Sequence, residues 1–271
     1  METILYAVLS LGGLGLIFGL ILGYASLKLA VEVDPKIPLV RGVLPSANCG
    51  ACGFAGCDAY AQAAVEGDVA LNLCSVGGAA VAEKIGELLC VTVDTEEPKK
   101  AFVKCQGTHA NAKEKYNYSG TMNCHEVAVL PGGGPKGCVY GCLGLGSCVK
   151  VCPFNSIHIV NGIAVVDEST CTGCGLCSKT CPKSIIELTP VSKRVRVTCS
   201  SKLKGVQDVK THCAVGCIAC GLCERNCPSK AIKLVNNLPV IDYDNCTQCG
   251  ICVGKCPTKA ILNIRKECPT A

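Results

Sequence analysis

Hydrophobic and polar positions divide the chain into one long apolar segment and several short alternating ones. Residues 4–30 are largely apolar, and Lys28 is their only charged residue. This segment predicts a helix of about 40 Å against a bilayer core of roughly 30 Å. Four later segments, CPFNSIHIV, CPKSIIELT, CPSKAIKLV and CPTKAILNI, each predict a turn followed by a short strand. Asn161-Gly162 and Asn236-Asn237 are typical hairpin turns, with return strands at 163–166 and 239–241.

The apolar segment 4–30 predicts a single membrane crossing. Its front carries Glu2 and no basic residue, unlike a secretory signal peptide. Lys28, Lys36 and Arg41 all lie on its C-terminal side, so the positive-inside rule places residues 31–271 in the cytoplasm. We therefore expect a single-pass protein of the cell membrane. Its reducing surroundings argue against structural disulfides.

Cysteine is the outstanding feature of the composition, with 26 among 271 residues. Hydrophobic residues make up 49% and charged residues 17%, which excludes a wholly disordered chain. Three cysteine runs match C-x2-C-x2-C-x3-C-P, and a fourth, stretched run precedes them at 138–152. This run is typical of bacterial ferredoxins, in which the fourth cysteine binds the other cluster of the pair.

Applied to each pair of runs, that rule predicts two modules with interlocked [4Fe-4S] ligands. The predicted ligand sets are Cys171, Cys174, Cys177 with Cys152; Cys138, Cys142, Cys148 with Cys181; Cys217, Cys220, Cys223 with Cys256; and Cys246, Cys249, Cys252 with Cys227. Zinc also binds four cysteines, but four runs that each end in Cys-Pro favour iron–sulfur clusters. In the stretched run, the extra residues 143–147 leave open which cysteines are ligands.

A different cysteine pattern follows the apolar segment. Cys49, Cys52, Cys57 and Cys74 have the spacing C-x2-C-x4-C-x16-C, and the Ala-rich stretch 58–65 permits a helix that returns Cys74 to the other three. Four cysteines indicate one more metal centre. From spacing alone, zinc stays an alternative to an iron–sulfur cluster.

These motifs together resemble one family over essentially the whole chain. An N-terminal apolar helix, NCGACGFAGCDAYA with a distal cysteine, GPKGCVYGCLGLGSCVKVCPF and further ferredoxin repeats are similar to B subunits of Rnf complexes, the ion-translocating ferredoxin:NAD oxidoreductases. The resemblance implies a [4Fe-4S] cluster on Cys49, Cys52, Cys57 and Cys74, and hence five clusters. It also implies electron transfer from reduced ferredoxin to membrane-bound iron–sulfur and flavin subunits. NAD reduction and Na⁺ or H⁺ translocation would occur elsewhere in the assembly.

Six cysteines remain outside the predicted sets. Cys105 and Cys124 precede the first module, and Cys199 and Cys213 precede the second. We expect each pair to lie close together beside a cluster, and we favour buried thiols over further metal ligation. Cys90 and Cys268 are expected to be plain thiols.

The charge balance depends on the clusters. The formal charge is +5, and five clusters of charge −2 would bring it to about −5. Nucleic-acid binding has no support, since the chain shows neither interleaved aromatic residues nor a recognised binding motif. One local basic stretch could dock an acidic carrier such as ferredoxin, with an ordinary solvated loop as the alternative. Its members are Lys193, Arg194, Arg196, Lys202, Lys204 and Lys210.

The sequence thus predicts an α+β protein with one transmembrane helix, a small mainly helical iron–sulfur domain and two tandem 2[4Fe-4S] ferredoxin-like modules. The predicted segments are a transmembrane helix (1–30), an N-terminal cluster domain (31–92), a linker (93–134), a first module (135–190), a basic connector (191–212) and a second module (213–271). The predicted function is an electron relay without a substrate site of its own. The alternatives are a polyferredoxin of another respiratory or hydrogenase-type complex and a non-redox metal storage or sensor protein.

Overall fold

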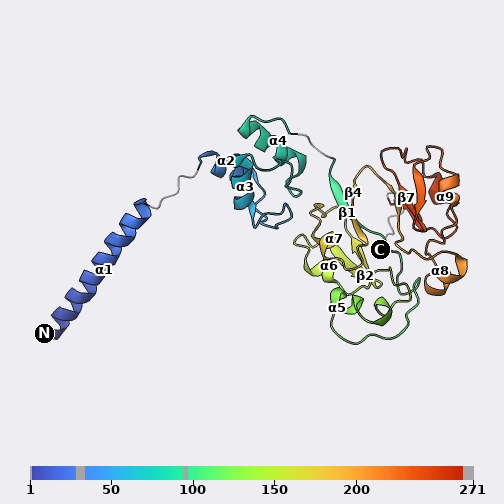
Figure 1. Ribbon diagram of the computed structural model, residues 1–271, viewed down its shortest axis with the longest axis horizontal. Coiled ribbons are helices and arrows are strands. Elements are labelled where there is room, and N and C mark those ends of the chain that lie inside the picture. The colour runs from blue at the N-terminus through green and yellow to red at the C-terminus, as the bar shows by residue number, and fades with distance from the viewer. Residues whose placement is uncertain (1, 29–33, 94–96, 265–271) are drawn as a thin grey trace.

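The computed structural model describes residues 2–28, 34–93 and 97–264, and Figure 1 shows their arrangement. The chain begins with helix α1 (Glu2–Lys28), along which large apolar side chains such as Leu11, Phe18 and Tyr24 are exposed. Over the described ranges, no helix has the length and apolar character of a membrane span. The crossing predicted for residues 4–30 is therefore unsupported, and residues 29 and 30 lie outside the described residues.

Three helices build the N-terminal domain: α2 (Lys36–Val43), α3 (Cys57–Glu66) and α4 (Gly78–Leu89). The helix predicted at 58–65 is confirmed by α3, which ends at Gly67 with a left-handed backbone (φ 81°). Small alanines on α3 let Tyr60 and Ile85 pack together with Val40 in a common core. The cysteine loop before α3 is thereby held against a rigid helical base.

The first ferredoxin-like unit, here called module 1, extends from residue 97 to residue 190. Its strands are β1 (Lys99–Val103), β2 (Ile157–Val160), β3 (Ile163–Val166) and β4 (Ile186–Pro190). Its helices are α5 (Cys124–Ala128), the 3-10 turn η1 (Pro131–Gly133), α6 (Ser147–Lys150) and α7 (Leu176–Thr180).

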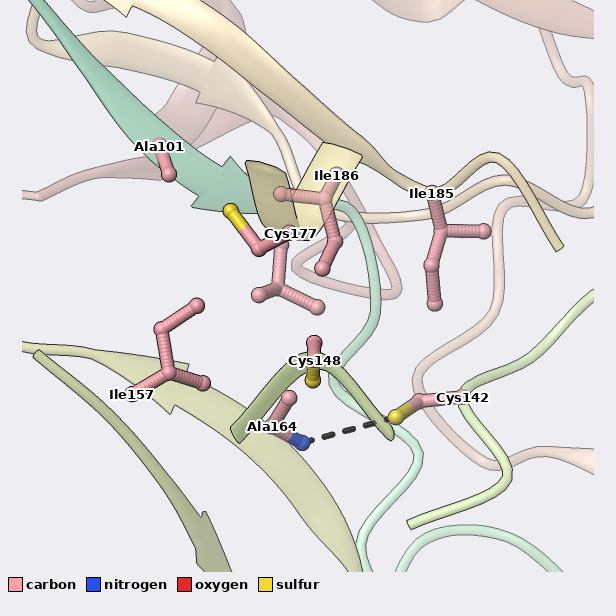
Figure 2. Close-up of a cluster of buried hydrophobic side chains, with 9 residues drawn as sticks. Ala101, Cys142, Cys148, Ile157, Ala164, Cys177, Ile185 and Ile186 are labelled. Atoms are coloured by element: carbon pink, nitrogen blue, oxygen red, sulfur yellow. Dashed lines mark hydrogen bonds between the residues drawn. The ribbon is translucent and has the colours of Figure 1, made fainter. Parts of the chain in front are cut away.

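Two antiparallel pairs organise module 1. The predicted hairpin is confirmed: β2 pairs with β3, and Asn161 and Gly162 turn between them with positive φ values of 49° and 78°. Strand β1 pairs with β4 across more than eighty residues of chain, with Lys99 opposite Pro190. Apolar residues from both pairs pack with cysteines in one core (Figure 2).

The second unit, module 2, repeats this plan over residues 191–264. Its strands are β5 (Val195–Val197), β6 (Ile232–Val235), β7 (Leu238–Ile241) and β8 (Ile261–Asn263). Its helices are α8 (Val206–His212), α9 (Leu222–Arg225) and α10 (Ile251–Lys255). The hairpin is β6 with β7, and the long-range pair is β5 with β8.

The long-range pairs correct the predicted domain boundaries. The linker at 93–134 contains β1, and the connector at 191–212 contains β5 and α8. Both strands pair with the last strand of their own module, so both segments are part of the folded units. Local patterns missed them because β1 and β5 find their partners far along the chain.

The two modules are joined by specific contacts. The backbone N–H of Ala214 donates to the carbonyl of Asn111 (2.8 Å), and the hydroxyl of Ser200 donates to the carbonyl of Tyr140 (2.8 Å). A guanidinium nitrogen of Arg196 lies 2.9 Å from a carboxylate oxygen of Glu168 across the same boundary. The two modules therefore contact each other directly, through backbone and side-chain groups of both.

Candidate iron–sulfur centres

The N-terminal cysteines meet in one pocket. Cys49, Cys52, Cys57 and Cys74 all line it, between the loop before α3 and the turn before α4. The backbone N–H of Gly77 points at Sγ of Cys74 (3.4 Å). Burial raises the pKa of Cys74, and the nearby Cys57 thiol raises it further. The sequence-predicted set is thus brought together in space.

A second pocket lies in module 1 on the side of the N-terminal domain. It is lined by Cys152, Cys171, Cys174 and Cys177. Burial raises the pKa of Cys177 to about 11, with added repulsion from Cys174 and Cys171. Burial also raises the pKa of Cys174, and among the thiols that add to this effect is Cys49. Cys74 and Thr172 line one cavity between the N-terminal domain and module 1, so the two cysteine pockets lie near each other.

The third pocket departs from the predicted set. Cys142, Cys148 and Cys181 line it as expected, but the fourth cysteine is Cys124 on α5 and not Cys138. Burial raises the pKa of Cys148 to about 12, and Cys142, Cys124 and Cys181 raise it further. Figure 2 shows Cys142 and Cys148 near Ala164, whose N–H donates to Sγ of Cys142 (3.4 Å).

Cys138 lies instead in a pocket between the two modules. That pocket is also lined by Cys105, Cys199 and Cys213, three of the six cysteines outside the predicted ligand sets. The predicted pairing of Cys105 with Cys124 is not found, since these two residues line different pockets. The repeated segments CVYGC (138–142) and CAVGC (213–217) are the sequence signal that could have linked Cys138 to Cys213.

Module 2 brings most members of its predicted sets together, and Cys227 packs against the same core as Cys246 and Cys252. Burial raises the pKa of Cys217 to about 11, and its neighbours Cys223 and Cys256 add to this. Burial likewise raises the pKa of Cys252 to about 11, with Cys246 and Cys249 among its neighbours. Unlike the ligand candidates of module 1, Cys220 and Cys249 are exposed.

The chemistry of these groups suits iron–sulfur clusters. Buried thiolates that repel one another are costly unless cations neutralise them. Backbone N–H groups aimed at sulfur, as at Cys74 and Cys142, favour the anionic cluster that thiolates hold. Within the described ranges, no three His, Cys, Asp or Glu side chains converge closely enough to hold one single metal ion.

The predicted docking residues fall into two groups. Arg194, Lys202, Lys204 and Lys210 are exposed, and Lys193 is half-buried. Arg196 is only 2% exposed and stacks on Phe102. Its inclusion in the docking surface was wrong, because its charge is already paired with Glu168.

Two cysteines stand apart from all the pockets described above. Cys90 caps the C-terminus of α4 and is exposed. Cys268 lies outside the described residues.

Family comparisons match three parts of the chain. Residues 44–76 match an Fe-S cluster family, residues 164–187 match the 4Fe-4S binding domain, and residues 216–260 match the 4Fe-4S dicluster domain. These ranges contain the N-terminal set, one regular run of module 1 and both runs of module 2. The segments around Cys105, Cys124, Cys138, Cys199 and Cys213 lie outside them.

Whole-chain relatives are also found. The chain is 48% identical to the B subunit of the proton-translocating ferredoxin:NAD(+) oxidoreductase complex of Clostridium ljungdahlii, over 89% of this chain and 85% of that protein. It is 45% identical to the B subunit of the Na(+)-translocating complex of Acetobacterium woodii, over 90% and 73%. It is 44% identical to the B subunit of the ion-translocating oxidoreductase complex of Methanosarcina acetivorans, over 90% and 92%.

Proposed function

Because this chain belongs to the family of B subunits of ion-translocating ferredoxin:NAD oxidoreductase complexes and acts as an electron relay, we propose that its donor is reduced soluble ferredoxin. Its acceptors are the membrane-bound iron–sulfur and flavin subunits of such a complex. The observation that carries this proposal is the succession of cysteine pockets, in which the N-terminal pocket adjoins module 1 through Cys49 and Cys174.

The proposed relay holds five [4Fe-4S] clusters, one in the N-terminal domain and two in each module. When bound, each cluster supplies a one-electron carrier. The cysteines hold the clusters, and backbone N–H groups directed at sulfur stabilise the more negative, reduced state. The pockets exclude water to different degrees, since Cys142, Cys148 and Cys177 are buried while Cys220 and Cys249 are exposed. Module 2 is therefore the more accessible end, and we place the entry of electrons there.

Ferredoxin docking is assigned to exposed basic side chains of module 2. Lys202, Lys204 and Lys210 are exposed and lie before the first ligand of that module. Opposite charges on an acidic carrier would steer its approach and increase the association rate at low salt. Reversing all three charges should slow reduction by ferredoxin about tenfold at low salt and flatten its salt dependence. An unchanged rate would remove this surface from the proposal.

We also propose that α1 holds the chain at the cell membrane in a single pass, with the modules on the cytoplasmic side. Exposed apolar side chains along α1 support its place in the membrane. The basic residues that follow it, Lys36 and Arg41, support the orientation. Alkaline extraction of membranes tests the span: a chain that stays in the pellet supports it, and one released to the supernatant refutes it.

The proposed function is tested on the complex captured anaerobically through a tag on this chain. We expect NAD reduction driven by reduced ferredoxin in the detergent-solubilised wild-type material. The Cys49→Ala variant should lose this activity, while the exposed Cys90→Ala control should keep it. Wild-type material that retains its iron but fails to reduce NAD, and passes electrons to another acceptor, would overturn the assignment.

A further inference from the structure

The pocket between the modules has the features of a ligand site that none of the family matches covers. Cys105 and Cys138 reach it from module 1, and Cys199 and Cys213 reach it from module 2. The space among its lining atoms is about 480 Å³, part of it open to solvent, against about 390 Å³ for the Cys124 pocket. The two spaces are therefore comparable in size.

The four cysteines are related by the repeat of the two modules. Sγ of Cys105 accepts the N–H of Gly107 and of Cys142, both at 3.3 Å. Sγ of Cys199 accepts the N–H of Ser201 (3.4 Å) and of Cys217 (3.3 Å). Each sulfur thus has one donor two residues onward and a second donor on a cysteine of a cluster-binding run, Cys142 in module 1 and Cys217 in module 2.

The other two cysteines are equivalent in the same way. Cys138 lies four residues before Cys142, and Cys213 lies four residues before Cys217, each with a glycine before the later cysteine. At Gly141, an added Cβ would lie 3.6 Å from Cβ of Cys138 and 3.7 Å from Sγ of Cys105. At Gly216, an added Cβ would lie 3.6 Å from Cβ of Cys213. Each module therefore contributes two cysteines in matching positions.

The stretched run of module 1 explains how Cys138 becomes available. Cys142, Cys148 and Cys152 correspond to Cys217, Cys223 and Cys227 of module 2, so the cysteine equivalent to Cys220 is absent. Cys124 fills that role in space, since it lines the pocket of Cys142, Cys148 and Cys181. Its backbone N–H donates to the hydroxyl of Ser147 beside Cys148 (2.8 Å), which fixes α5 against α6.

We propose that Cys105, Cys138, Cys199 and Cys213 hold a sixth [4Fe-4S] cluster between the modules, and that Cys124 completes the set of Cys142, Cys148 and Cys181. This inference rests on the proposed electron relay and deepens it. When bound by these four cysteines, such a cluster would supply a one-electron carrier between the modules: one electron from a reduced neighbour would pass on to an oxidised neighbour, with no bond or proton exchanged. Hydrogen bonds connect the proposed ligands to both modules, because the N–H of Cys142 donates to Sγ of Cys105 and the N–H of Cys217 donates to Sγ of Cys199.

A buried cation supports a negative group at this site. Lys136 is 4% exposed and lines the same pocket. Its Nζ donates to the carbonyl oxygens of Gly107 (2.7 Å) and Gly162 (2.6 Å), and none of the described carboxylates forms an ion pair with it. A cluster held by four thiolates carries net negative charge and would pair with this cation across the pocket.

The test is the metal content of the full chain, purified anaerobically with its complex. We expect about 24 iron and 24 sulfide per subunit in the wild type. Cys213→Ala should reduce both numbers by about four and remove one signal from the EPR spectrum of the reduced protein. The Cys90→Ala control should keep the wild-type content. Cys138→Ser, which preserves size and polarity, should give the same loss as Cys213→Ala while the Cys142 site stays filled.

Each alternative result is distinct. A wild type with about 20 iron per subunit and intact NAD reduction would overturn the sixth cluster and leave the proposed function standing. Bound zinc, or a Cys105, Cys138, Cys199 and Cys213 group that reacts fully with an alkylating reagent in the native protein, would also overturn it. A wild type with about 24 iron but without ferredoxin-driven NAD reduction would instead overturn the proposed function.

Discussion

Module 1 and module 2 repeat one plan in different surroundings. Both combine a hairpin with a long-range strand pair, and both bury a cysteine on each short helix of their regular runs. Module 1 has the N-terminal domain on one side and module 2 on the other, whereas module 2 leaves Cys220, Cys249 and Ile251 exposed. The repeat thus fixes the arrangement of the cluster-binding cysteines in both modules. The surroundings decide how far these cysteines are exposed, and they are more exposed in module 2.

The largest expected effect comes from removing matching ligands in the two modules. Cys177 and Cys252 are buried at the same position of their runs. If the relay passes through both modules, Cys177→Ala and Cys252→Ala should each reduce ferredoxin-driven NAD reduction to background. Steady-state NADH formation by the captured complex measures this. Full activity in Cys252→Ala, with about four iron atoms lost, would place module 2 outside the path and break the comparison.

The second prediction concerns the contact that joins the modules. Arg196 on β5 of module 2 stacks on Phe102 and pairs with Glu168, both of module 1. Loss of one partner of a buried pair costs about 3 kcal/mol or more, and the partly exposed Glu168 places this pair at the lower end. Arg196→Ala should therefore lower the thermal midpoint by roughly 10 °C.

Its matched control lies two residues away on the same segment. Arg194 is exposed, and its described hydrogen bonds are made by its backbone: its N–H donates to Gln248 (2.9 Å) and its carbonyl accepts the N–H of Ile264 (3.1 Å). Arg194→Ala should stay within about 0.5 kcal/mol of the wild type. Differential scanning calorimetry under anaerobic conditions compares the two variants. Equal losses in both would show that the ion pair across the boundary does not stabilise the two modules.

The third prediction concerns the potential of the clusters near Lys136. A buried cation favours the reduced, more negative state of a nearby cluster. Lys136→Met should therefore lower the midpoint potential of the adjacent clusters, by tens of millivolts at an effective dielectric constant of roughly 20. Lys150 offers the control, because its Nζ also donates to a carbonyl, that of Met122 (3.0 Å), but is exposed. An EPR-monitored redox titration in which both variants shift equally would contradict the special role of the buried charge.

The regular elements of the protein could be predicted from its sequence, whereas the strands that pair over long distances along the chain could not. The hairpins, helix α3 and the gathering of Cys49, Cys52, Cys57 and Cys74 follow from local spacing, turn residues and short loops. Strands β1 and β5 could not be found in this way, because their apolar residues look like linkers until β4 and β8 pair with them.

The same limit applies to the cysteines. A rule based on spacing assigned Cys138 to the run in which it stands, although its neighbours in space are Cys105, Cys199 and Cys213. Cys124 lies far before the run it joins. The spacing of a ligand run therefore predicts which cysteines share a pocket where the run is complete, as at Cys171, Cys174 and Cys177. Tertiary contacts decide where a cysteine is missing from the run.

The smallest expected effect concerns the hydrogen-bond acceptors beside strands β1 and β5. Shortly before β1, the carboxylate of Glu97 accepts the N–H (2.6 Å) and the hydroxyl (2.9 Å) of Ser192 at the start of module 2. At β5, the neutral amide oxygen of Gln248 accepts the N–H of Arg194 and of Val195. The two Ser192 bonds, backbone first, lower the pKa of Glu97 below 4.5. Its stabilisation is therefore present above about pH 4.5 and is lost as the pH falls through the lowered pKa.

Glu97→Gln should consequently speed amide exchange in β1 at neutral pH, and this difference from the wild type should shrink below about pH 4.5, as the wild-type carboxylate takes up its proton. Strand β5 should show no matching change, because its amide acceptor does not titrate there. Hydrogen–deuterium exchange across this range, with Ser192→Ala as the matched variant, follows both strands at once. An equal pH response in β1 and β5 would mean that acid acts on a feature that both modules share, and not on the carboxylate of Glu97.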